Sequence, residues 1–153
     1  MNSIYALKPE AVAISRAAFK EAILDDISDL FAESYDLDRV AVRDGLQERE
    51  KLGSTGFGRG VAIPHARVMG IHRPVVAMLK LDKPVDFEAA DGLPVDLVVG
   101  LLSPENCGAA HLHALAAVSR LVRDERMHEA LIDAPDGEAL FALLTNVTDR
   151  DAA

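Results

Sequence analysis

Residues 49–67, with the sequence REKLGSTGFGRGVAIPHAR, constrain the fold more than any other stretch of the chain. Glycine occupies every second position at 56, 58 and 60, and a glycine-rich backbone can approach another group closely because no Cβ intervenes. The apolar run 61–63 is typical of a short buried strand. Pro64 has no N–H and suits the end of a strand. The stretch therefore predicts a flexible glycine loop, a strand, and His65 at the exit of that strand, where a rigid support exposes the imidazole.

Hydrophobic periodicity predicts the elements around this segment. Apolar residues at 19, 23, 27, 30 and 31 predict an amphipathic helix from Phe19 to about Glu33, with Lys20 on its polar face. Asp38 is the expected N-cap of a second helix that ends near Glu50, although Gly45 inside it costs roughly 1 kcal/mol relative to alanine. Strands are expected at 74–80 and 95–102, a turn or edge strand at 84–87, and helices at 108–123, 125–132 and 138–144. Residues 11–18 fit either a strand or the first turn of a helix.

These elements predict an α/β fold, more closely an α+β arrangement with a mixed sheet. We expect a single compact domain in which helices flank a central mixed β-sheet, because 153 residues suit one domain with its own core. The N-terminal segment 1–18 is expected to pack on the domain or lead into it. The domain itself then spans 19–148, and 149–153 form a frayed tail.

Charge and composition exclude several classes of function. The formal net charge of −9 argues against broad binding to nucleic acid or to anionic membranes, although Arg43, Arg49, Arg59 and Arg67 flank His65 in sequence. The single cysteine, Cys107, cannot form an internal disulfide and fits a reducing compartment. We see no signal-peptide pattern and no apolar run of 18 residues, so we expect a cytoplasmic protein without membrane insertion.

His65 is the leading candidate for chemistry, since a neutral imidazole is a nucleophile and a known covalent carrier in group transfer. The alternative is a histidine that merely donates to a backbone carbonyl. Arg49 could hold phosphate oxygens with its planar guanidinium, or it could form a surface ion pair with Glu48 or Glu50.

The remaining candidates are polar residues around the glycines and the other histidines. Ser54 and Thr55 could offer hydroxyl or N–H groups to an anion, or they could simply shape a turn. Positions i and i+2 of a helix point about 200° apart, so at most one of His111 and His113 can face His65. His72 and His128 are expected to be solvated.

Metal and nucleotide sites are not expected. The histidines offer neither cysteine partners nor an i, i+4 pair for a metal. The glycine segment lacks the Lys-Ser/Thr of a P-loop, and it precedes a strand where a dinucleotide fingerprint should follow one.

The chain resembles a known family in two places. The run RE-K-x-GSTG-x-G-x-G-x-AIPH, from Arg49 to His65, is similar to the active segment of the type-2 IIA domains. These domains belong to the fructose/mannitol and nitrogen-regulatory branches of the phosphoenolpyruvate-dependent phosphotransferase system. The second similarity is HLHAL at 111–115, preceded by strand-like segments at 95–97 and 101–104. Ala66 departs from the pattern, because many relatives have glycine there.

The resemblance implies a mannitol-IIA-like fold and a phosphotransferase component with a phosphohistidine intermediate. By this resemblance His65 accepts the phosphoryl group on Nε2, Arg49 stabilises it, and His111 orients the site by hydrogen bonding. The expected phosphoryl-binding loop is Ser54, Thr55 and Gly56, and no cofactor is needed. The GSTGxGxGxAIPH form looks most like the nitrogen-regulatory IIA, with an HPr-type carrier of the nitrogen branch as donor and regulated proteins such as ion transporters or kinases downstream.

Three alternatives stay open at this point. The chain could be the IIA component of a fructose/mannitol-type transporter, which passes phosphate to a IIB domain. It could be a regulatory binding module without catalysis. A metal-dependent hydrolase that uses the histidines is a third possibility.

Overall fold

A computed structural model of the chain describes the backbone of residues 4–152 and the side chains of residues 4–145. In this part the elements follow one another as β1 (Ala6–Ser15), α1 (Lys20–Tyr35), α2 (Arg39–Lys51), β2 (Gly56–Gly58), β3 (Val61–Ala62), β4 (His65–Val68), β5 (Val75–Val85), β6 (Val95–Pro104), α3 (Ala110–Arg123), α4 (Glu125–Asp133) and α5 (Gly137–Ala152). Within the described residues none of the helices is long and apolar enough to cross a membrane.

The strands form one mixed sheet, as the sequence predicts. Its order is β1-β5-β6-β3-β2, and β4 also pairs with β6. β1 runs parallel to β5, β5 runs antiparallel to β6, and β3 and β4 both run parallel to β6. β6 therefore lies at the centre of the sheet, which confirms the expectation for its apolar sequence.

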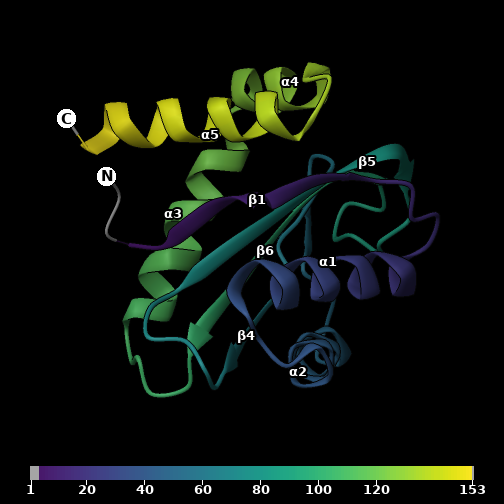
Figure 1. The fold of residues 1–153 in the computed structure, drawn as a ribbon. Coiled ribbons are helices and arrows are strands. Elements are labelled where there is room, and N and C mark those ends of the chain that lie inside the picture. The colour runs from purple at the N-terminus through teal and green to yellow at the C-terminus, as the bar shows by residue number, and fades with distance from the viewer. Residues whose placement is uncertain (1–3, 153) are drawn as a thin grey trace.

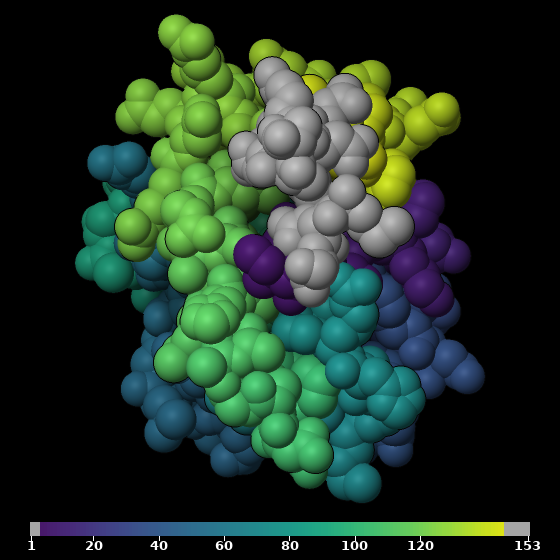
Figure 2. Space-filling model, turned by 90° about the vertical axis from the view of Figure 1, so that its left-hand side faces the viewer, coloured from purple at the N-terminus to yellow at the C-terminus, as the bar shows by residue number. Residues whose placement is uncertain are grey.

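Helices cover both faces of this sheet (Figure 1). The side chains of β6 alternate between two hydrophobic cores: Val98 and Leu102 pack with α1 and α2, whereas Leu97 and Leu101 pack with α3, α4 and α5. Figure 2 looks onto the left-hand side of Figure 1, where the green atoms of α3 lie exposed along the face. The three layers confirm the predicted α/β architecture.

Several predicted boundaries were wrong. The N-terminal strand begins at Ala6 rather than at residue 11, and β5 continues through Pro84 and Val85. Phe19 does not join the buried stripe of α1, because it is the N-cap of that helix and is 61% exposed. α5 continues to Ala152, well past the predicted end at 144. The fraying expected for 149–153 stays a prediction, and residue 153 lies outside the described residues.

Two local features place α2 beside β4. Asp38 is the N-cap of α2, as predicted, and its carboxylate accepts from the N–H groups of Val40 and Ala41. Gly45 brings the helix close to the strand, because a Cβ there would lie 3.3 Å from the Cβ of Ala66. Ala66, the departure from the family pattern, therefore faces α2.

Gly100 lies where the centre of β6 crosses under α1, and we predict that Gly100→Ala destabilises the protein. A Cβ at this position would approach a Phe31 ring carbon to 2.6 Å and Ile27 to 3.0 Å. Overpacking of this kind costs about 1–3 kcal/mol of the free energy of unfolding, measurable by urea denaturation. In the double variant Gly100→Ala/Phe31→Leu the smaller side chain makes room, so the two costs should not add. Strict additivity would show that the contact with Phe31 is not the cause.

Candidate active site

His65 is placed by the pairing of two short strands with β6. Val61 pairs with Leu97 and His65 pairs with Leu101, so β3 and β4 keep the same register. The N–H of Leu101 donates to the carbonyl of Pro64 across the gap, at 2.9 Å. β3 and β4 are in effect one strand, interrupted at Ile63 and Pro64, and His65 opens its second half.

The glycine segment is a tight hairpin instead of the flexible loop that the sequence suggested. β2 pairs antiparallel with β3. The turn uses positive φ angles at Gly58 (116°), Arg59 (58°) and Gly60 (81°). The first of these glycines also approaches a side chain closely, because a Cβ on Gly58 would lie 3.0 Å from the carboxylate of Asp91. The hairpin is thus a fixed support beside the strand that carries His65.

The hydrogen bonds of the His65 ring define its tautomer. Nδ1 lies 2.8 Å from the carbonyl oxygen of Ile63, which can only accept, so Nδ1 carries the proton. Nε2 is then an acceptor, and Nε–H of Arg49 donates to it at 3.3 Å. Arg49 comes from the last turn of α2, and its NH1 group donates to the carbonyl of Gly53 at 2.8 Å. The expected alternative of a surface ion pair for Arg49 is not what this geometry shows.

His111 lies beside the His65 ring. The two ring centroids are 5.6 Å apart, with their planes inclined by 45°. His111 stands in the first turn of α3 and is buried, and its Nδ1 lies 2.7 Å from the hydroxyl of Ser103. His113 is exposed, so only one of the two histidines faces the site, as helix geometry requires. The structure thus brings together Arg49, His65 and His111.

Both site histidines are held in their neutral form. Burial lowers the pKa of His65 below its ordinary value, and the positive charge of Arg49 acts in the same direction. Burial lowers the pKa of His111 to about 4, with smaller contributions from His65 and Arg67. At neutral pH the His65 ring therefore presents a lone pair on Nε2 within a setting of fixed positive charge.

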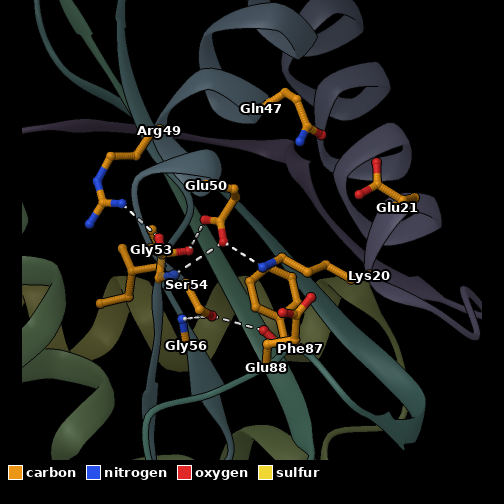
Figure 3. Close-up of polar contacts among 12 residues, drawn as sticks. Lys20, Glu21, Gln47, Arg49, Glu50, Gly53, Ser54, Gly56, Phe87 and Glu88 are labelled. Atoms are coloured by element: carbon orange, nitrogen blue, oxygen red, sulfur yellow. Dashed lines mark hydrogen bonds and ion pairs between the residues drawn. The ribbon is translucent and has the colours of Figure 1, made fainter.

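The hydroxyl groups of the expected phosphoryl-binding loop are engaged in the fold. Ser54 Oγ donates to the carbonyl of Phe87 at 2.8 Å and accepts from the N–H of Gly56 at 3.0 Å (Figure 3). Thr55 Oγ donates to the Glu50 carboxylate. The role of these residues in phosphoryl binding stays a prediction. To bind a phosphoryl group, the two hydroxyls would have to give up their present hydrogen bonds.

A buried ion pair that the sequence pattern does not indicate lies next to Arg49. Nζ of Lys20 lies 3.0 Å from the Glu50 carboxylate, and their side chains are 15% and 2% exposed. Lys20 had been placed on the solvent face of its helix. No helix or strand periodicity relates positions 20 and 50 of the sequence. The one sequence feature that could have pointed to Glu50 is its place directly after Arg49 in the motif.

The other histidines lie outside this site. His72 is exposed as expected, but the expectation was wrong for His128. Its Nε2 lies 2.9 Å from a carboxylate oxygen of Asp96, which raises the pKa of His128. Among residues 4–145 no three metal-ligating side chains are grouped for an ion.

Comparisons with known proteins agree on one family. Residues 6–147 match the model of "Phosphoenolpyruvate-dependent sugar phosphotransferase system, EIIA 2". The "Nitrogen regulatory protein" of Pseudomonas aeruginosa is 43% identical over 129 residues, which cover 84% of each chain. The crystal structure of Nitrogen Regulatory Protein IIA-Ntr from Neisseria meningitidis superposes with a TM-score of 0.82 at 34% identity, over 90% of this chain and 95% of that one. IIA mannitol from Escherichia coli has the same fold, with a TM-score of 0.75 at 23% identity over 91% and 99% of the two chains.

The order in which the histidines titrate follows from their surroundings and can be measured by NMR. We expect the His111 ring to titrate near pH 4, His65 below the ordinary value of about 6.5, and His128 above it. In the unfolded chain His65 and His111 bind protons at about pH 6.5, whereas in the folded protein they do so only at lower pH. The stability that their neutral rings contribute is therefore lost as the pH falls below about 6.5. Single His→Gln variants assign the signals. A His65 midpoint above 6.5 would contradict the described environment.

Proposed function

The chain belongs to the EIIA type-2 family of the phosphoenolpyruvate-dependent sugar phosphotransferase system, and we propose that it is a phosphocarrier of the nitrogen-regulatory kind. In this proposal Nε2 of His65 accepts a phosphoryl group from a histidine-phosphorylated carrier of the HPr type. The observation that carries the proposal is the hydrogen bond from Nδ1–H to the Ile63 carbonyl, which leaves the lone pair on Nε2.

The proposed step exchanges one N–P bond for another. Nε2 attacks the phosphorus while the N–P bond of the carrier breaks, and the carrier imidazole leaves with the electron pair. The His65 ring keeps its Nδ1 proton and becomes a cation when Nε2 is substituted. The Ile63 carbonyl, 2.8 Å from Nδ1, would stabilise this cation through the same hydrogen bond, now charge-assisted.

Arg49 must change partners during this step. Its Nε–H occupies the lone pair of Nε2 at 3.3 Å, a long and therefore weak hydrogen bond. As the phosphoryl group approaches, its oxygens offer the guanidinium stronger, charge-assisted bonds. Such stabilisation of the transferring group is the main contribution that a protein makes to phosphoryl transfer. His111 would stay neutral and orient the site without competing for the phosphoryl group, given its pKa of about 4.

A regulatory role is supported by the nitrogen regulatory proteins among the relatives. In this role the phosphorylation state of His65 would be the signal, because the phosphoryl group adds negative charge at this half-buried position. The downstream partners would be regulated proteins such as ion transporters or kinases. Transfer onward to a sugar-specific IIB domain would instead indicate the transporter role.

The first test is phosphorylation in vitro with phosphoenolpyruvate, Enzyme I and an HPr-type carrier. We expect an acid-labile mass increase of one phosphate in the wild type and none in His65→Ala. His113→Ala is the matched control, because this histidine lies on the same helix as His111 but is exposed. Absence of the increase with both sugar-branch and nitrogen-branch carriers would overturn the phosphocarrier proposal in favour of a binding module.

Substitution of Arg49 tests the stabilising role of the guanidinium. We expect Arg49→Ala to slow single-turnover transfer about 100-fold, the usual cost of removing one preorganised donor. Arg49→Lys should recover only part of the rate, because an ammonium group cannot replace the planar fork. Equal rates for wild type and Arg49→Ala would show that Arg49 has no part in transfer.

A further inference from the structure

We propose that Glu50, with Lys20 as its counterion, is a positioning residue that holds Arg49 and His65 in place for phosphoryl transfer. The inference rests on the proposed function of His65. It concerns residues that touch neither the reacting nitrogen nor the incoming phosphoryl group.

The Glu50 carboxylate is fully engaged although it is almost completely buried. One oxygen accepts from the N–H of Thr55 at 3.1 Å and from Nζ of Lys20 at 3.0 Å. The other oxygen accepts from the hydroxyl of Thr55. The Lys20 ammonium also lies 4.7 Å from the centroid of the Phe87 ring. Figure 3 shows Glu50 between Lys20 of α1 and the segment from Gly53 to Gly56.

Thr55 connects Glu50 to His65 through hydrogen bonds. Its N–H and hydroxyl bind Glu50, while its carbonyl accepts from the N–H of Ile63 at 3.0 Å. The carbonyl of Ile63 in turn accepts from Nδ1–H of His65. An unbroken series of hydrogen bonds therefore joins Glu50 to the group that fixes the tautomer of the reactive ring.

Glu50 also helps to hold Arg49, through Thr55 and the carbonyl of Gly53. Glu50 fixes Thr55, and two residues earlier the carbonyl of Gly53 accepts from NH1 of Arg49. Arg49 itself precedes Glu50 in the last turn of α2. The backbone of Arg49 is fixed by α2, and its guanidinium is fixed by the Gly53 carbonyl. The Glu50 carboxylate binds Thr55 and so fixes the chain that carries this carbonyl.

Fold stability alone gives little reason for a charged pair at this place. Removing two ions from water costs free energy that their attraction often fails to repay, and apolar replacements of such pairs are frequently neutral or stabilising. A carboxylate, however, accepts from a backbone N–H, a hydroxyl and an ammonium at once, which no apolar side chain can do. We infer that what Glu50 supplies is geometry at the site.

The test separates positioning from stability with two variants and one control. Glu50→Gln removes the charge, and Lys20→Met/Glu50→Leu removes both charges and all acceptors without leaving an unpaired ion. Glu48→Gln is the matched control, because Glu48 lies on the same helix in an exposed pair with Lys51. The readouts are single-turnover transfer from the phosphorylated carrier, the KM for that carrier, thermal unfolding, and the His65 tautomer from ring ¹⁵N shifts.

We expect transfer to fall about 10- to 100-fold in both variants, since misplacement of reacting groups by an ångström has effects of this size. The KM should stay close to that of the wild type, because the side chains of Lys20 and Glu50 are only 15% and 2% exposed and offer little surface to a docking partner. The double variant should unfold at or above the temperature of Glu50→Gln, and its transfer should stay low. The population of the Nδ1–H tautomer should fall in both, and the control should match the wild type.

Recovery of transfer together with stability in the double variant would overturn the proposal, as would an unchanged rate in Glu50→Gln. If the wild type itself accepts no phosphoryl group, the proposed function fails. The positioning role can still be tested in that case, because the ¹⁵N measurement of the His65 tautomer needs no carrier. Unchanged ¹⁵N shifts in the double variant would overturn the positioning role.

Discussion

The parallel pairing of β3 and β4 with β6 is the interaction on which the site depends. Because both short strands keep one register, the chain can break at Ile63 and Pro64 without losing its place in the sheet. The carbonyl of Pro64 accepts from the N–H of Leu101 on β6, so the carbonyl of Ile63 before it points away from β6 and lies 2.8 Å from Nδ1 of the ring two residues later. The register with β6 therefore decides which carbonyl is left to accept from the imidazole and to fix its tautomer.

Sequence patterns predicted the elements with strong periodicity and clear end signals. Asp38 begins α2, and the apolar run 95–102 forms the central strand. The start of β1 was missed because the register shifts between Leu7 and Val12, so the exposed residues between them break the alternation of a strand. Family resemblance, rather than periodicity, singled out His111, which the structure places beside His65.

The environments of several polar side chains depend on tertiary contacts that sequence patterns do not predict. Lys20 has the sequence context of a solvated residue, yet its ammonium lies over the Phe87 ring and against Glu50. His128 pairs with Asp96, which is 32 positions away in the chain. Both pairs join residues with no periodic relation, because they arise where α1 packs against α2 and where α4 packs against β6. The hydroxyls of Ser54 and Thr55 were equally ambiguous, since turn geometry and anion binding favour the same residue types.

The weak hydrogen bond between Arg49 and Nε2 of His65 also has a consequence for chemical selectivity. In the unmodified protein the lone pair of the ring is capped by a donor, so a neutral electrophile meets a masked nucleophile. In the proposed transfer an anionic donor group would draw the guanidinium to itself and uncover the nitrogen as it arrives. Under the proposed function the ring would therefore favour reagents that bring their own negative charge over neutral electrophiles.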